Sequence, residues 1–126
     1  MNSQELKEKS KKFALRVIKL TDSLPRTRAA DVIAKQILRS STSVGANYRS
    51  ACRARSKADF ISKITIVEEE ADESLYWLEI IRDSGMLGQE RLNDLMDEAS
   101  ELVAIFTSSG KTAKQNNPNS TIRNPK

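Results

Sequence analysis

The residues most suggestive of chemistry are five carboxylates close together near the middle of the chain. They are Glu68, Glu69, Glu70, Asp72 and Glu73. Carboxylate oxygens are the ligands that Mg²⁺ and Ca²⁺ prefer, so such a cluster could hold a hard divalent cation. On a helix, however, three of the five fall on outward positions and the other two flank an apolar stripe. We therefore favour a solvated or interface acidic face over a metal site.

Nucleophilic catalysis would need partners that this sequence lacks. The 126 residues contain no histidine, which excludes Ser-His-Asp and Cys-His arrangements and the Glu-x-x-His pairs of di-iron bundles. The single cysteine, Cys52, has Arg49, Arg53 and Arg55 close by, and neighbouring cations can activate a thiol. Because no catalytic partner accompanies Cys52, we interpret it as a small structural residue at the edge of a bundle rather than as a reactive thiol. We expect no enzymatic activity, no cofactor and no metal.

Cations follow one side of the segment around residues 28–53. At 100° per residue, five of them fall within roughly an 80° sector of a helix and face away from its apolar stripe. Such a ridge can neutralise nucleic-acid phosphates, with binding that weakens as salt rises. The alternative is ordinary surface charge, helped by an i,i+4 pair of Asp31 with Lys35. The residues predicted to bind RNA or DNA are Arg28, Lys35, Arg39, Arg49 and Arg53, extended by Arg55 and Lys57. The first helix adds Lys7, Lys11 and Lys12 to this basic surface.

Charge divides the chain into a basic and an acidic part. Residues 1–67 hold fifteen Lys and Arg against five Asp and Glu, residues 68–110 hold two against twelve, and residues 111–126 add four cations. This asymmetry predicts a polyanionic partner, head-to-tail self-association, or both. In a ring, the acidic third and fourth helices of one subunit could meet the basic first and second helices of the next.

The elements that carry these residues are helices, because apolar residues recur at alternating spacings of three and four. Four such stripes predict an all-α fold, an antiparallel up-and-down four-helix bundle. We expect the bundle over residues 1–110, with helices at about 3–24, 27–54, 57–84 and 89–109, and a disordered basic tail over 111–126. Ser3 and Ser56 are expected to cap helix starts. Pro25, Gly85 and Gly110 are expected to follow helix ends.

The second helix contains a stretch of poor helix formers, residues 40–47, which could instead be a loop. A loop would interrupt an apolar stripe that keeps its register from Ala30 to Ala51, so we favour a continuous helix whose small residues admit a close neighbour. Asn47 interrupts that stripe, and we expect it to fix register through a buried hydrogen bond, with direct contact to a ligand as the alternative.

The third helix is apolar on more than one side. A bundle alone needs one apolar face per helix, so the surplus predicts a subunit interface, and a wide core face is the alternative. Tyrosine and tryptophan are enriched in interfaces. The predicted oligomer interface comprises Ile66, Glu73, Tyr76, Trp77 and Ile80.

Nothing in the sequence predicts a membrane partner. The segment Met1–Lys12 is polar and charged, and no apolar run approaches the roughly 18 residues of a membrane span. A lone cysteine fits a reducing compartment, so we expect a cytoplasmic protein.

The stretch Ser43–Phe60, SVGANYRSACRARSKADF, resembles a family of bacterial proteins encoded in intervening sequences of 23S rRNA genes. The similarity runs from about Phe13 to Leu87 and includes Ile37-Leu38-Arg39-Ser40-Ser41, Ala46-Asn47 and Arg55-Ser56-Lys57. Many relatives have proline in place of Gly45 and Ala-Glu-Gly in place of Arg49-Ser50-Ala51.

The resemblance implies an up-and-down bundle that assembles into a homopentameric ring. The family is also similar to accessory proteins of diversity-generating retroelements, which bind nucleic acid and a reverse transcriptase. Together these observations lead us to expect a ring-forming, nucleic-acid-binding bundle, and alternatively an oligomeric protein-interaction scaffold without nucleic-acid binding.

Overall fold

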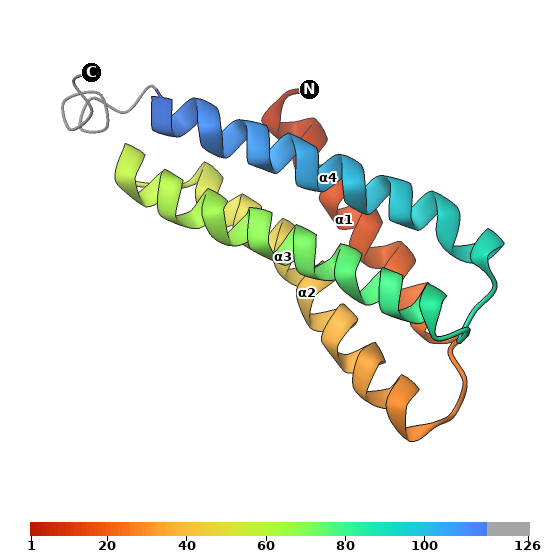
Figure 1. Cartoon of the computed structure of the whole chain (residues 1–126). Helices are drawn as coiled ribbons and strands as arrows, with labels where there is room; N and C mark the ends of the chain where they lie inside the picture. Colours follow the sequence, from red (N-terminus) through yellow and green to blue (C-terminus); the bar gives the residue numbers. More distant parts are fainter. Residues whose placement is uncertain (116–126) are drawn as a thin grey trace, which may run out of the picture.

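Four helices make up the computed structural model, which describes residues 1–115 of the chain. They are α1 (Ser3–Thr21), α2 (Arg28–Cys52), α3 (Lys57–Asp83) and α4 (Gln89–Gln115). Each helix packs against its neighbours in the chain, and α4 returns to α1, while neither diagonal pair makes direct backbone contact among these residues. The arrangement is the predicted antiparallel up-and-down bundle (Figure 1). The α1–α4 contact is much less extensive than the others.

The predicted stripes line the interior. The buried apolar residues of α1 are Leu6, Phe13, Val17 and Leu20, and those of α4 are Leu92, Leu95, Ala99, Leu102 and Phe106, at the alternating spacings of three and four that predicted the helices. Tyr48 of α2 and Phe106 of α4 meet across the centre, with ring centroids 5.2 Å apart. The largest fully buried apolar side chains are Phe13, Phe106, Ile37, Ile64, Leu78, Ile81, Leu92 and Leu102.

Small residues let α2 approach both of its neighbours, and α2 is one continuous helix through residues 40–47, as predicted. A Cβ added to Gly45 would lie 3.1 Å from the Ser10 Oγ of α1, so only glycine fits without a shift. On the other side, the buried hydroxyls of Ser40 and Ser74 lie 3.0 Å apart and tie α2 to α3. The prediction for Asn47 was wrong: its amide donates to the Ser43 carbonyl of its own helix at 2.8 Å. The two serines, rather than Asn47, therefore make the buried hydrogen bond between these helices.

The helix ends follow local chemistry, with three corrections. Asn2, rather than Ser3, caps α1, because its side chain and that of Glu5 form a reciprocal capping box. At the start of α3, the Ser56 side chain accepts from the Asp59 N–H as predicted. Gly85, at φ 77°, follows the end of α3 in the left-handed conformation that glycine favours. α1 ends at Thr21, before the predicted residue 24.

The third correction concerns α4, which passes through Gly110 and ends at Gln115. Gly110 is buried against α3, where an added Cβ would lie 3.5 Å from a Glu68 carboxylate oxygen and 3.8 Å from Ile64. Packing on α3 thus offsets the weak helix propensity of glycine, and residues 111–115 belong to the helix rather than to a tail. The remainder of the predicted tail, residues 116–126, lies outside the described residues. Within residues 1–115, no helix is long and apolar enough to cross a membrane.

Candidate nucleic-acid interface

All seven predicted cations are exposed, and for the four that lie on α2 the helical spacing predicts this. Thr27 caps α2, its side chain accepting from the Ala30 N–H, and this start sets the rotation of the helix. Ile37 and Val44 then point inward, so the cations between and beyond them point outward. With 25 residues, α2 is about 37 Å long, so the cations at its two ends serve separate surfaces.

The cations in the first half of α2 are mostly paired within the chain. Lys35 Nζ lies 3.4 Å from the Asp31 carboxylate. Arg39 bridges to α3, with its guanidinium 3.2 Å from Glu70 and 2.5 Å from Glu73. The Glu73 and Glu70 carboxylates raise the pKa of Arg39 above its ordinary value. Arg39 is therefore engaged with α3 rather than held free for a phosphate.

Glu73 connects Arg39 to the indole of Trp77. Trp77 Nε1 donates to the Glu73 carboxylate at 3.0 Å. This hydrogen bond and the Arg39 guanidinium lower the pKa of Glu73 below its ordinary range. Sequence reasoning assigned Arg39 to a nucleic-acid ridge and Glu73 and Trp77 to a subunit interface, but the structure joins the three in one network. Side chains on two helices meet here, so periodicity within either helix could not have shown the contact.

The second group of cations lies where α2 ends and α3 begins. Arg49, Arg53, Arg55 and Lys57 are all exposed there. Arg49 and Arg53 make no ion pair with any residue of the described part of the chain. The Arg55 backbone N–H donates to the Asp59 carboxylate at 3.2 Å, which leaves its guanidinium outside that bond. We call these four residues the junction cations, and they are the part of the predicted ridge best placed to meet an anionic partner.

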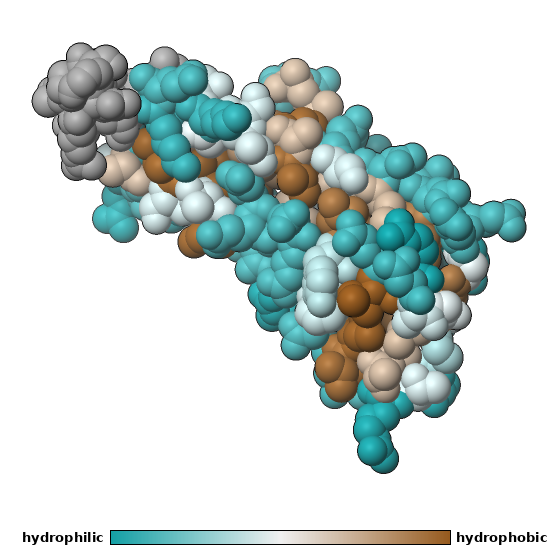
Figure 2. Space-filling view, viewed as in Figure 1, coloured by the Kyte–Doolittle hydropathy of each residue, from teal (hydrophilic) through white to brown (hydrophobic). Residues whose placement is uncertain are grey.

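The predicted interface residues of α3 differ in exposure. Tyr76 is 50% exposed and Ile66 is 38% exposed, whereas Trp77 and Ile80 are half-buried. The Tyr76 and Trp77 rings meet edge-to-face with centroids 5.0 Å apart. On the face seen in Figure 2, hydrophobic side chains gather where the first half of α2 lies beside the C-terminal half of α3. Trp77 packs against the core, so part of the extra apolar surface of α3 is a wide core face rather than a surface for another subunit.

Exposed apolar residues on α1 and α2 were missed by the sequence reasoning. Leu15 is 55% exposed and Ile18 is 42% exposed on the outer side of α1, and Val32 is 54% exposed on α2. The available signal was their position: Leu15 and Ile18 fall off the inward stripe of α1 and are three residues apart, so they share its outer face.

The acidic residues also have partners within the chain. Lys9 pairs with Glu101, and Arg16 pairs with Glu98, so α1 and α4 attract one another across their short contact. Part of the charge asymmetry between the two halves therefore stabilises the single chain. Among residues 1–115, no group of three or more Cys, Asp or Glu side chains is placed to hold a metal ion.

Comparison with known proteins identifies the architecture. The model of the 23S rRNA-intervening sequence protein family matches residues 2–108, which is most of the chain. The chain belongs to this family. No protein of established annotation matches.

A crystal structure from the same kind of protein agrees with the fold. It comes from Bacteroides thetaiotaomicron and is described as a protein of unknown function from the S23 ribosomal protein family. The two chains are 38% identical, the match covers 88% of this chain and 99% of that one, and the TM-score is 0.80. The resemblance to the 23S rRNA-intervening sequence protein family is thus confirmed over residues 2–108.

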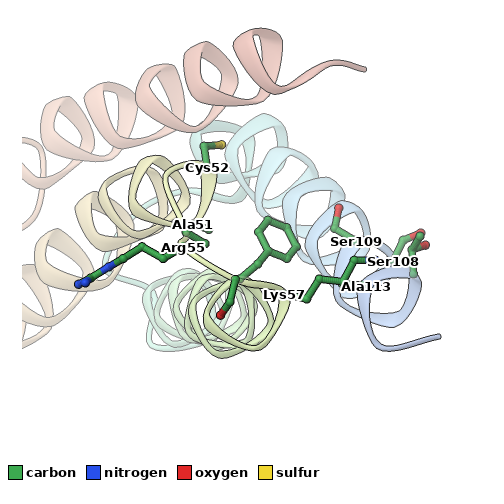
Figure 3. Close-up of a pocket in the computed structure, with 11 residues that line it drawn as sticks. Ala51, Cys52, Arg55, Lys57, Ser108, Ser109 and Ala113 are labelled. Carbon is green, nitrogen blue, oxygen red and sulfur yellow. The ribbon is translucent and has the colours of Figure 1, made fainter. Parts of the chain in front are cut away.

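In this member of the family, Cys52 lies at the mouth of a pocket of about 680 Å³. The pocket is bounded by the end of α2, the start of α3 and the last turns of α4 (Figure 3). Ser108, Ser109 and Ala113 line it from α4, while Arg55 directs its guanidinium away from it. Cys52 is exposed and forms no disulfide. A phenol is protonated at neutral pH and is no base for the thiol, and burial, with the hydrogen bond to Cys52, raises the pKa of Tyr48 further, to about 12.

Proposed function

We propose that this protein is a non-enzymatic, homo-oligomeric bundle that binds nucleic acid through the junction cations. The observation that carries the proposal is the exposure of Arg49, Arg53, Arg55 and Lys57 together, with Arg49 and Arg53 free of ion pairs among residues 1–115. Cations without an acidic neighbour can exchange counterions for phosphates at little cost. Phosphate contacts of this kind bind without reading sequence.

The bundle topology supports this location. In an up-and-down bundle the N-terminus of α1, the C-terminus of α2, the N-terminus of α3 and the C-terminus of α4 lie at one end. Lys111 and Lys114, exposed on the last turns of α4, therefore lie at the same end as the junction cations. The family name connects these proteins with 23S rRNA genes, which makes a structured RNA the first ligand to test.

A pair of charge reversals tests the proposal. We expect Arg49→Glu with Arg53→Glu to weaken binding of a structured RNA by at least about tenfold at low salt, since each lost phosphate contact removes a charge-assisted bond. The matched control is Lys19→Glu with Arg26→Glu, which makes the same charge change at the opposite end of the bundle. Fluorescence anisotropy over a salt series measures both. Equal weakening by the two pairs, or no binding by the unaltered protein, would refute the proposal.

We also propose that the oligomer uses exposed apolar side chains, with a homopentamer as the assembly expected from the family resemblance. Ile66 and Tyr76 on α3 and Leu15 and Ile18 on α1 lie on different sides of the subunit, as a head-to-tail ring requires. Tyr76→Glu should lower the mass measured by light scattering while leaving the helical circular dichroism unchanged. An unchanged mass would remove Tyr76 from the interface. A reverse transcriptase as protein partner stays a prediction that follows from the resemblance.

The second candidate is an oligomeric scaffold that binds no nucleic acid. The observation favouring it is the internal pairing of basic residues: Lys9, Arg16 and Arg39 all bridge to acids on another helix. An oligomer by light scattering that shows no anisotropy change with RNA at physiological salt would support this candidate over the first.

A further inference from the structure

A groove runs along the outer side of the contact between α1 and α2. It has a volume of about 490 Å³. Its floor is formed where Gly45 of α2 meets Ser10 of α1, with Ala14 and Ala46 beside them. The groove exists because these four residues, two on each helix, are small, whereas larger side chains would fill the space between the helices. The backbones therefore approach closely and leave an open channel above them.

Cations dominate the walls of this groove. Lys7 and Lys11 line it from α1, and Arg49 lines it from α2. Lys7 and Lys11 are one helical turn apart, about 6 Å along the axis. Glu8 is the one acidic residue among the lining residues, and no ion pair within residues 1–115 joins it to any of the three cations. The groove thus carries a net charge of two positive units with its cations uncommitted.

The groove is continuous with the junction cations, because Arg49 belongs to both. A ligand that crosses the end of α2 over Arg53 and Arg55 reaches Lys7 and Lys11 by passing along this channel. The Thr42 hydroxyl also lines the groove, and it donates to the Leu38 carbonyl at 2.7 Å, so its oxygen can accept but its proton is committed. The donors that face the groove are therefore mainly charged ones, which suits phosphate oxygens better than neutral acceptors.

We propose that this groove is a subsite for the phosphodiester backbone, in which Lys7, Lys11 and Arg49 bind consecutive phosphates of one strand. The inference rests on the proposed function and adds to it the path that the strand takes along the groove. The small residues of the floor admit the backbone to within reach of the cations. Binding here should depend on the shape of the channel as well as on its charge.

Shape is tested without any change of charge by Ala46→Leu. Ala46 is exposed and both residues favour helix, so the bundle should keep its stability. The leucine would occupy the channel, and we expect affinity for a structured RNA to fall roughly tenfold. The matched control is Ala104→Leu, at an exposed alanine of α4 remote from the groove, which should leave affinity unchanged.

Charge is tested by Lys7→Gln with Lys11→Gln, against Lys12→Gln with Lys19→Gln as exposed lysines outside the groove. Losing two phosphate contacts should reduce the slope of log affinity against log salt by about 1.4 to 1.8, whereas the control should change it less. Glu8→Gln should raise affinity, because it removes the one opposing charge that lines the groove.

The outcomes separate this inference from the proposed function. If RNA binding persists and responds to Arg53→Glu but is indifferent to Ala46→Leu and to the lysine pair, the groove is overturned as a subsite while the function stands. If the unaltered protein binds no RNA, the function and the subsite both fail. Greater loss with Ala104→Leu than with Ala46→Leu would also overturn the subsite.

Discussion

Replacing Gly110 by alanine measures whether α4 continues past the position at which a sequence pattern would end it. In the structure Gly110 is inside the helix, its φ is negative, and an added Cβ would lie 3.5 Å from Glu68 and 3.8 Å from Ile64. These are ordinary contact distances, so the methyl group fits. Alanine is favoured over glycine within a helix by about 0.5–1 kcal/mol, and we expect Gly110→Ala to stabilise the protein by that amount.

Gly45→Ala is the matched comparison, because the same exchange meets a tighter site. The added Cβ would lie 3.1 Å from Ser10 Oγ, and that hydroxyl is held by a 2.8 Å bond to the Leu6 carbonyl. We expect the gain in helix propensity to be lost there, leaving Gly45→Ala about 1 kcal/mol less stable than Gly110→Ala. Ser10→Ala combined with Gly45→Ala should recover the gain, because the clashing oxygen is gone.

The assay is urea denaturation followed by circular dichroism, at one protein concentration because an oligomer would make the midpoint concentration-dependent. An unchanged m-value with a higher midpoint for Gly110→Ala is the expected result. If Gly110 instead ended the helix with a positive φ, alanine would be strained and the midpoint would fall. A lower midpoint for Gly110→Ala, or equal effects at Gly110 and Gly45, would refute this reasoning.

Three further measurements test the core and the α2–α3 network. Phe106→Ala should lower the free energy of unfolding by about 3–5 kcal/mol, since it empties a fully buried site beneath Tyr48, and an effect below about 1 kcal/mol would contradict that packing. Glu73 has its pKa lowered from 4.5 by Trp77 and Arg39, so its stabilising effect is present above pH 4.5 and is lost as the pH falls through the lower, folded-state pKa. The denaturation midpoints of the unaltered protein and Glu73→Gln should therefore converge on acidification, and a gap independent of pH would speak against this linkage. In a Tyr76→Phe variant, ultraviolet titration should show Tyr48 ionising near pH 12, and ionisation near its ordinary value of 10.0 would mean that burial and Cys52 do not raise its pKa.

Helix-end chemistry marks how far local patterns predicted the fold. Ser56 and Gly85 occupy the predicted positions, since a cap depends on a few neighbouring residues. Asn2 was overlooked because Ser3 is an equally good capping residue, and the Glu5 side chain, which completes the box with Asn2, decided between them. Gly110 was misjudged because glycine ends helices in the absence of packing, and the contact with α3 is not visible in local sequence.

The candidate site also has features that local sequence predicted and features that only packing decided. Exposure of the four cations on α2 followed from its helical period, and the three at the junction with α3 are exposed as well. Whether each cation is free to bind an anionic partner did not follow from the helical period, because Glu70 and Glu73 engage Arg39 from a different helix. The apolar character of α3 was recognised, but only packing shows that Trp77 belongs partly to the core while Tyr76 is at the surface.

By itself, the sequence determined that this chain forms four amphipathic helices, where each begins and ends to within a few residues in most cases, and which side of each is buried. Those properties depend on the 3.6-residue period and on local capping, which act between residues near in the chain. Only the tertiary structure decided which cations are paired, that Gly45 and Ser10 meet in a groove, and that the predicted basic residues Lys7 and Lys11 share that groove with Arg49. Such features arise where two helices meet, and the distance between side chains on different helices is set by packing rather than by spacing along either one.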